Sequence, residues 1–267
     1  MKIIAVVGAR KNGNTEEILR FFSRALEEKL DAEVDILNLY DYPIPLCTGC
    51  HSCILTGEDT CPHRDAVRKI EGKLTASDGL ILASPGYMFS VTAIMKNFLD
   101  HVAYNCHRPK YFGKKAFLLS ACTKWQEKGV FIPMETWASG SGFTVSGKAY
   151  TDLLPFPQAE SDLEKKRSAL RRAAETFAAA LRGQNAPPRP GFGDYMIFNV
   201  FSRIARVMPN VFSADYTYFS KIGAYEGADW YRPSTPRFLP RALTRLLAGR
   251  IEKALDKMID HERLAEG

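Results

Sequence analysis

The stretch KIIAVVGARKNGNT, residues 2–15, decides the fold. It opens with Lys2–Val7, a continuous Ile/Val run typical of a strand that is buried on both faces of a parallel sheet. A turn rich in Gly and Asn follows, and residues 15–30 then place their apolar side chains at helical spacing. The stretch therefore predicts a buried strand that leads through a tight loop into the first helix of an α/β unit.

The same alternation of strands and helices continues downstream. Short connections in β-α-β order are compatible almost only with a parallel sheet and right-handed crossovers. We therefore expect a three-layer, doubly wound α/β domain over residues 1–182. Its further strands are expected over 32–39, 79–83, 115–121 and 143–149, and its helices over 65–74, 92–104 and 161–181, with 136–140 in an additional helix.

A Pro/Gly-rich break, GQNAPPRPGFG at residues 183–193, ends this domain. Beyond it, aromatic and Arg-rich segments over 194–207 and 239–259 flank a tyrosine-rich stretch that we expect to be irregular. Residues 183–267 are thus predicted to form a mostly helical C-terminal extension. It could serve as a flap over the α/β domain, as an arm of a homo-oligomer or as a membrane-surface element.

Composition excludes several classes of protein. With 267 residues, 46% of them hydrophobic and 25% charged, the chain is globular. The 36 basic and 30 acidic residues give a net charge of +6 that is spread along the chain, which disfavours nucleic-acid binding. We expect no membrane span, because no apolar run reaches about 18 residues. Six cysteines are too few for a secreted disulfide scaffold, so a cytoplasmic location is expected.

The loop between the first strand and the first helix, residues 8–15, is suited to an anion. Such a loop presents free backbone N–H groups and the positive end of the helix dipole. Asn14 and Thr15 add side-chain donors, and Arg10 or Lys11 can neutralise a phosphate. The loop is neither a Walker loop nor the G-x-G-x-x-G fingerprint of dinucleotide-binding domains. An ordinary capped turn between strand and helix is the alternative.

A second loop, residues 84–90, follows the strand expected over 79–83. Pro and Gly set a sharp turn there, and Tyr87, Met88 and Phe89 place large side chains at the carboxyl edge of the sheet. Ligands of such sheets bind at this edge, near the point where the strand order reverses. The two loops together suit a ligand with a phosphate and a planar ring, although the aromatic turn alone could equally belong to the core.

Taken in order, the motifs of residues 1–182 resemble the flavodoxin-like NADPH-dependent FMN reductase family, including its iron–sulfur flavoprotein branch and a subgroup with a C-terminal extension. The first loop is similar to the family's G-S-x-R-x-x-G-N-T. The other matching pieces are the cysteine-rich stretch, residues 76–79 leading into 84–87, residues 95–101, residues 107–109 and residues 112–115.

This resemblance implies a flavodoxin-like fold and an FMN site built from the two loops. It implies phosphate contacts from Arg10, Asn12, Gly13, Asn14 and Thr15, and contacts to the flavin ring from Pro85, Gly86, Tyr87, Met88 and Phe89. The chain departs from the family pattern in three places. The phosphate loop is one residue short, Ala9 stands where a Ser is common, and residues 121–125 replace a Thr/Gly-rich loop.

Four cysteines crowd into the pattern C-x2-C-x2-C-x7-C, formed by Cys47, Cys50, Cys53 and Cys61. The spacing is similar to the compact motif of the iron–sulfur flavoproteins and favours a [4Fe–4S] cluster beside FMN. A structural zinc site is a second interpretation, although zinc sites usually use two separated cysteine pairs. In a third, the cysteines hold no metal and are structural or redox thiols.

The five histidines show no metal-ligand spacing, and no Ser-His-Asp order is present, so a hydrolase has little support. His101 and His107 flank Tyr104 near the predicted flavin edge. They could contact a nicotinamide, but a position on a helix surface is the more common situation for such histidines.

We therefore predict an FMN-dependent oxidoreductase that takes electrons from NAD(P)H and passes them to a quinone, flavin or metal acceptor. The flavin carries the chemistry, so no side chain is assigned a catalytic role. An iron–sulfur flavoprotein electron carrier served by ferredoxin is one alternative, and a flavodoxin-fold protein without bound flavin is another. The resemblance also implies a homo-oligomer.

Overall fold

A computed structural model describes residues 1–123, 127–153, 156–183, 189–232, 234 and 238–260. It divides the chain into two compact units. Unit 1 comprises residues 1–50 and 62–185, and unit 2 comprises residues 51–61 and 186–267. Most of the cysteine-rich stretch thus belongs to the same unit as the C-terminal extension.

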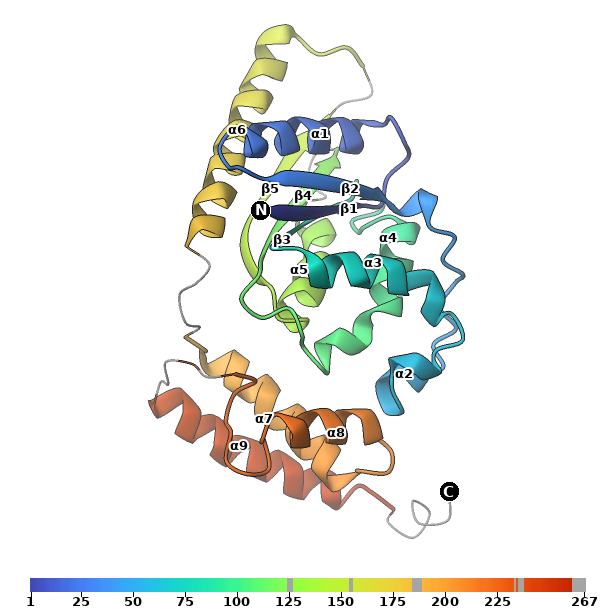
Figure 1. The fold of residues 1–267 in the computed structure, drawn as a ribbon, viewed down its shortest axis with the longest axis vertical. Coiled ribbons are helices and arrows are strands. Elements are labelled where there is room, and N and C mark those ends of the chain that lie inside the picture. Colours follow the sequence, from blue (N-terminus) through green and yellow to red (C-terminus); the bar gives the residue numbers. More distant parts are fainter. Residues whose placement is uncertain (124–126, 154–155, 184–188, 233, 235–237, 261–267) are drawn as a thin grey trace. The chain divides into compact units, whose positions relative to one another are not determined.

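Unit 1 is built on a five-stranded parallel sheet in the order β2-β1-β3-β4-β5 (Figure 1). This is the flavodoxin-like strand order, so the predicted fold class is confirmed. The first pairing runs from Lys2 opposite Glu33 to Val7 opposite Asn38, and Val7 also pairs with Ala83 of β3. The strands are β1 (Lys2–Val7), β2 (Glu33–Asn38), β3 (Gly79–Ala83), β4 (Lys115–Cys122) and β5 (Thr144–Asp152).

Helices cover both faces of the sheet because its strands are apolar on both sides. Helices α1 (Asn14–Glu27) and α6 (Glu160–Arg182) pack on one face, where Phe22, Phe117 and Phe177 form the centre of the core. The other face is covered by α3 (Arg64–Ala76), α4 (Ala93–His101) and α5 (Glu127–Gly140). The helix expected only over 136–140 thus extends back to Glu127 and carries Pro133 in its interior.

The sheet geometry places the two loops of interest next to each other. Strand β1 lies between β2 and β3, so the chain crosses to one side after β1 and to the other side after β2. Both loops leave the carboxyl ends of the adjacent strands β1 and β3, where Gly8 donates a backbone hydrogen bond to the carbonyl of Ala83 at 2.9 Å. This reversal of strand order is the position at which doubly wound sheets bind ligands.

Unit 2 is helical. It contains α2 (Ser52–Leu55), α7 (Phe192–Val207), α8 (Ser213–Lys221) and α9 (Phe238–Asp256). An aromatic core holds it together, in which Phe198 contacts Phe219 and Tyr231 edge to face. The short helix α2 packs on α8, and the hydroxyl of Ser213 donates a hydrogen bond to the carbonyl of Leu55 at 3.4 Å.

Helix α8 corrects the expectation that the tyrosine-rich stretch is irregular. Its apolar periodicity is weak, but Phe219 is fully buried in the aromatic core and Asp215 in its first turn is 2% exposed. Packing, rather than a sequence pattern, selects this helix. In the part of the chain that the structure describes, no helix combines the length and the apolar character needed to cross a bilayer.

Candidate functional site

The loop after β1 presents unpaired backbone donors at the start of α1. Gly13 precedes the helix with extended backbone geometry and no side-chain cap. Within the described residues, the backbone N–H groups of Asn14, Thr15 and Glu16 have no hydrogen-bond partner. Asn12 adopts a left-handed conformation with φ of 55°, which turns the chain toward the helix. These donors point out of a helix N-terminus and form a cradle for an anion.

The two cations of this loop differ in whether they already form an ion pair within the protein. Arg10 is exposed and makes no ion pair with any described residue, so its guanidinium is available to a ligand. Lys11, by contrast, pairs with Asp41. Asn14 is exposed and Thr15 is buried. Of the two cations considered from the sequence, Arg10 is thus the one left to neutralise a phosphate.

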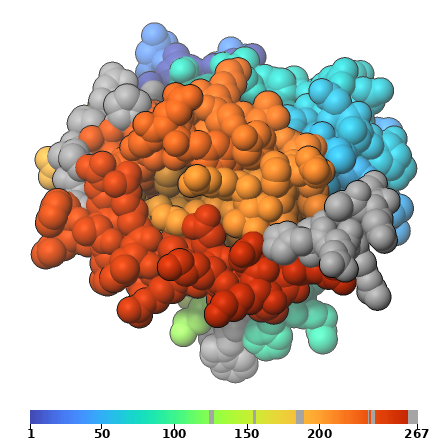
Figure 2. Space-filling model, turned by 90° about the horizontal axis from the view of Figure 1, so that it is seen from below, coloured from blue at the N-terminus to red at the C-terminus, as the bar shows by residue number. Residues whose placement is uncertain are grey.

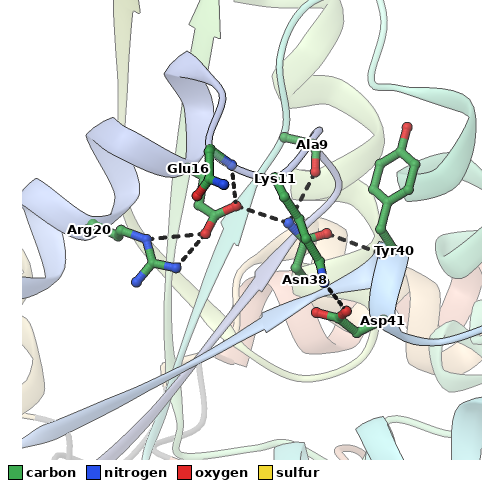
Figure 3. Close-up of polar contacts among 8 residues, drawn as sticks. Ala9, Lys11, Glu16, Arg20, Asn38, Tyr40 and Asp41 are labelled. Atoms are coloured by element: carbon green, nitrogen blue, oxygen red, sulfur yellow. Dashed lines mark hydrogen bonds and ion pairs between the residues drawn. The ribbon is translucent and has the colours of Figure 1, made fainter.

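A buried carboxylate beneath the loop fixes its shape (Figure 3). Glu16 is 4% exposed and accepts hydrogen bonds from the backbone N–H of Asn12 at 3.2 Å and from the Asn38 side-chain amide at 3.1 Å. The Arg20 guanidinium forms an ion pair with the same carboxylate. Burial opposes ionisation of Glu16, but these donors outweigh it and hold the pKa of Glu16 below its ordinary value. Glu16 is therefore an anionic anchor for the loop.

Asn38, the last residue of β2, completes this anchor. Its side-chain amide donates a second hydrogen bond to the carbonyl of Ala9 at 3.1 Å, and its side-chain oxygen accepts one from the backbone N–H of Tyr40 at 3.0 Å. Glu16 and Asn38 were missed in the sequence analysis. An acidic residue in the first turn of a helix is common, and only the three-dimensional contact between β2 and the loop reveals its role.

The loop after β3 forms a tight and strained turn. Tyr87 and Ser90 exchange backbone hydrogen bonds of 3.0 Å in both directions, and the two residues between them have positive φ angles, 48° for Met88 and 59° for Phe89. This is the geometry of a type I′ turn, which normally carries Asn and Gly. Bulky residues in such conformations are sparsely populated and cluster at functional sites.

The same turn exposes its large side chains. Tyr87, Met88 and Phe89 are 63%, 91% and 63% exposed, whereas Pro85 and Gly86 are buried at its base. Three exposed apolar side chains on a strained turn form a surface that favours a flat, apolar ligand. The structure excludes the alternative from the sequence analysis that these residues belong to the core.

Close backbone contacts fix this turn in place. A β-carbon at position 129 of α5 would lie 1.7 Å from the carbonyl oxygen of Phe89, so only glycine allows this approach. Thr92 caps α4 by accepting a hydrogen bond from the backbone N–H of Met95, and its hydroxyl donates to the carbonyl of Gly8 at 2.6 Å. Thr92 thereby links the two loops, which we call the edge loops.

The third departure from the family pattern, residues 121–125, lies only partly within the described residues. Cys122 ends β4 and is buried, and burial raises the pKa of its thiol. Lys124 and Trp125 lie outside the described residues. The edge loops are therefore the part of the predicted flavin site whose geometry the structure gives.

We call residues 47–61 the cysteine segment. Its four cysteines are divided between the two units. Cys47 and Cys50 are exposed and belong to unit 1, whereas Cys53 and Cys61 are half-buried and belong to unit 2. None of these cysteines forms a disulfide. Among the residues described, no three His, Cys, Asp or Glu side chains are grouped so that they could hold a metal ion. Because the four thiols belong to two units, the cluster, zinc and metal-free interpretations of these cysteines stay predictions.

Two buried side chains of α4 hold the start of the cysteine segment. The side-chain amide of Asn97 donates hydrogen bonds to the carbonyls of Ile44 and Pro45 at 3.2 and 3.0 Å, and its oxygen accepts the backbone N–H of Cys47 at 2.9 Å. The Nε2 atom of His101 lies 2.8 Å from the same Pro45 carbonyl. His101 is 3% exposed, so the expectation of a helix-surface histidine is wrong.

A family model for NADPH-dependent FMN reductase matches residues 1–145. An iron–sulfur flavoprotein of Archaeoglobus fulgidus is 37% identical over 115 residues, which cover 43% of this chain and 51% of that protein. An FMN-dependent NADPH-azoreductase of Staphylococcus saprophyticus is 27% identical over 115 residues, or 42% of this chain and 58% of that protein. The chain spans about half the length of the curated relatives it matches.

Solved structures agree on the fold. RosB with a bound 8-demethyl-8-formylriboflavin-5′-phosphate intermediate superposes with a TM-score of 0.55 at 12% identity, covering 88% of this chain and 91% of that chain. An FMN-dependent NADH-azoreductase of Bacillus anthracis in complex with FMN superposes with a TM-score of 0.51 at 11% identity, covering 67% and 100%. At these identities the likeness concerns the architecture alone.

Proposed function

Because the chain belongs to the NADPH-dependent FMN reductase family, we propose that it binds FMN at the edge loops and uses it to oxidise NAD(P)H. The electrons pass to a small acceptor, namely a quinone, a flavin or a metal ion. The observation that carries this proposal is the pairing of an anion cradle with a strained, exposed aromatic turn on adjacent strands.

The residues present fit the two ends of FMN. The unpaired N–H groups of Asn14 and Thr15, with the Arg10 guanidinium, suit a phosphate because they concentrate positive charge at a helix N-terminus. The exposed side chains of Tyr87 and Phe89 suit the flat ring system. FMN, when bound, supplies hydride acceptance and one-electron transfer, which no side chain can provide.

The protein's own contribution is then binding and orientation. Glu16 and Asn38 keep the phosphate loop in shape, and Gly129 keeps the turn against α5. Tyr87, Met88 and Phe89 shape the approach of the nicotinamide. We assign no acid or base, and we place the reaction in the cytoplasm, where cysteine thiols stay reduced. Residues 1–182 supply this activity, and residues 183–267 are an accessory extension.

Two alternatives to this function are each favoured by a specific observation. Similarity to an iron–sulfur flavoprotein and the presence of four cysteines favour an electron carrier that receives electrons from ferredoxin. The shortened phosphate loop, with Ala9 in place of a hydroxyl donor, favours a protein that keeps the fold without flavin. A cluster would require the cysteines of both units, so no step of the reaction is derived through it.

One purification distinguishes these functions. The protein is isolated without oxygen and its visible spectrum, iron, acid-labile sulfide, zinc and mass in solution are measured before and after FMN is added. We expect flavin bands, NAD(P)H oxidation and a homo-oligomer. About four irons per chain without NAD(P)H oxidation would favour the electron carrier, and a protein that stays colourless with FMN would favour the flavin-free alternative.

A pair of variants then tests the site. Arg10→Gln removes a cation that has no ion-pair partner among the described residues, so we expect FMN affinity to fall about tenfold, as for a lost charge-assisted contact to phosphate. Lys11→Gln, the adjacent cation that pairs with Asp41, is the matched control and leaves FMN affinity within about twofold. Equal losses in both variants would contradict the assignment of Arg10.

A further inference from the structure

The outward side of α9 carries exposed leucines that the proposed reaction does not use. Leu239, Leu243 and Leu246 are 77%, 49% and 59% exposed. Helix α9 is held by its opposite side, where Thr244 and Ala248 are fully buried and the helix packs on α7. The three leucines therefore contribute little to the core of unit 2, as far as the described residues show.

Cations continue the same line along the helix. Arg250 and Lys253 of α9, and Lys257 in the turn after it, are all exposed. Steps of four and three residues alternate from Leu239 through Lys257, so these six positions lie on one side of a helix with 3.6 residues per turn. We call this line of three leucines and three cations the α9 stripe.

Acidic side chains of α9 lie off the stripe. Glu252 faces α7, where it pairs with Arg203. Asp256 lies about 100° around the helix from Lys257. Figure 2 shows the surface of α9, in red, as an open band beside α7, in orange. The stripe is thus apolar at its start and positively charged at its end.

We propose that the α9 stripe docks unit 2 on an anionic lipid membrane. The leucines enter the boundary between headgroups and acyl chains, and the cations contact lipid phosphates, as in helices that lie in a membrane interface. This interaction needs no membrane-spanning segment. Docking would bring the oxidoreductase to the surface of the lipid bilayer, in which apolar electron acceptors dissolve.

Charge complementarity favours a membrane over a second copy of the chain. In a parallel pair of α9 helices the three cations would face each other, and in an antiparallel pair cations would be buried against leucines. Both arrangements are unfavourable. Nucleic acid would satisfy the cations but leave the leucines in water. An anionic bilayer offers partners to both halves of the stripe.

The test is flotation of the 267-residue chain, loaded with FMN, with lipid vesicles. Vesicles of phosphatidylcholine alone are compared with vesicles in which about a third of the lipid is phosphatidylglycerol. We expect binding to the anionic vesicles that is at least about tenfold tighter than to the neutral ones and that weakens as salt is raised, because surface charges are screened. Absence of binding, or equal binding to both vesicles, would overturn the proposal.

Two variants separate the halves of the stripe. Leu239, Leu243 and Leu246 are changed together to Ser, or Arg250, Lys253 and Lys257 together to Gln. Each set should reduce binding to anionic vesicles by about tenfold or more. The matched control changes three exposed cations of unit 1, Lys69, Lys165 and Arg172, to Gln and should bind like the parent protein. A loss in the control as large as in the cation variant would show general charge attraction and overturn the stripe.

Two further outcomes would overturn the proposal by identifying another partner of the α9 stripe. If the leucine variant lowers the mass of the protein in solution, the stripe is an interface between copies of the chain. If duplex DNA binds with the same dependence on Arg250, Lys253 and Lys257 while vesicles do not, the stripe is a nucleic-acid surface. Far-UV circular dichroism serves as the folding control, because unit 2 is helical and FMN content would report on unit 1 alone.

Discussion

The edge loops and the cysteine segment both carry side chains suited to redox chemistry, but they are supported in different ways. The edge loops belong entirely to unit 1 and are tied to each other by the hydrogen bond from Thr92 to Gly8. The cysteine segment begins in unit 1, where Asn97 holds it, and continues in unit 2. A flavin site can therefore form from one unit, whereas joint chemistry of all four cysteines depends on both.

A cofactor site made from one loop needs only local backbone geometry, whereas a site made from four separated thiols also needs the packing of distant segments. An anion cradle needs only a helix N-terminus and a loop of suitable geometry, which short-range contacts supply. Four thiols converge only if the backbone that carries them is fixed at every point.

The largest effect is expected from Gly129→Val. Its side chain would collide with the carbonyl of Phe89, so α5 or the turn must shift. We expect a loss of about 3 kcal/mol in the free energy of unfolding, as for severe overpacking, and FMN affinity lower by about a hundredfold. Urea unfolding and quenching of FMN fluorescence measure the two quantities.

The matched control is Gly72→Ala, also in a helix of unit 1 but with open space around its α-carbon. This change should raise the free energy of unfolding by up to about 1 kcal/mol, because alanine favours the helix, and leave FMN affinity unchanged. If Gly129→Val bound FMN like the parent protein, the turn would not form part of the flavin site.

A smaller effect is expected from Glu16→Gln, which tests the support of the phosphate loop. All partners of the Glu16 carboxylate are donors, so the amide NH2 of a glutamine would face donors without an acceptor. We expect a loss of about 2 kcal/mol in the free energy of unfolding and weaker FMN binding. The reactivity of Cys47 should not change, because no hydrogen bond or ion pair among the described residues joins Glu16 or Asn38 to the cysteine segment.

The pH dependence of unfolding gives a second measure of Glu16. Its pKa is lower in the folded state than in the unfolded state, so the stability it supplies is complete above about pH 4.3, the pKa of an unfolded glutamate, and is lost as the pH falls through the folded pKa. This acid-dependent loss should be smaller in Glu16→Gln. The control Glu17→Gln, at the exposed adjacent position, should keep the full acid dependence.

Asn97→Ala addresses the cysteine segment alone. It removes the hydrogen bonds that hold the backbone of residues 44–47, each contributing about 1 kcal/mol. We expect the alkylation rate of Cys47 to rise about tenfold while FMN affinity stays unchanged. Mass spectrometry of peptides measures the rate, with buried Cys122 as the internal reference.

The control for this prediction is Lys96→Ala, which removes an exposed ion pair with Asp100. An unchanged rate in Asn97→Ala would show that the segment is held elsewhere.

The parts of unit 1 that could be predicted from the sequence are those fixed by local rules. Lys2–Val7 and Gly79–Ala83 are found as expected, because strands buried on both faces are continuous apolar runs. The cradle at residues 8–15 follows from a Gly/Asn loop before a helix. Glu16, Asn38, Thr92 and Gly129 were not anticipated, because each acts through a contact with a segment distant in the sequence.

The cysteine segment shows the opposite case. Its spacing predicts four convergent thiols, yet spacing does not reveal that residues 51–61 fold with the extension, where Ser213 contacts Leu55. The burial of His101 was not anticipated either, because its partner, the carbonyl of Pro45, lies 56 residues away in the sequence. The convergence of the four thiols therefore stays a prediction, because it depends on contacts between segments that are distant in the sequence.

The smallest expected effect is a gain in stability. Met88→Asn with Phe89→Gly installs the residues that a type I′ turn prefers and relieves two positive φ angles. We expect the free energy of unfolding to rise by about 1 kcal/mol, while FMN affinity falls about tenfold because two exposed contact surfaces are lost. A higher free energy of unfolding together with a lower FMN affinity would show that the strained turn contributes to ligand binding. If stability and affinity both rose, the side chains of Met88 and Phe89 would have no part in binding, and the edge loops would owe their affinity to the phosphate cradle alone.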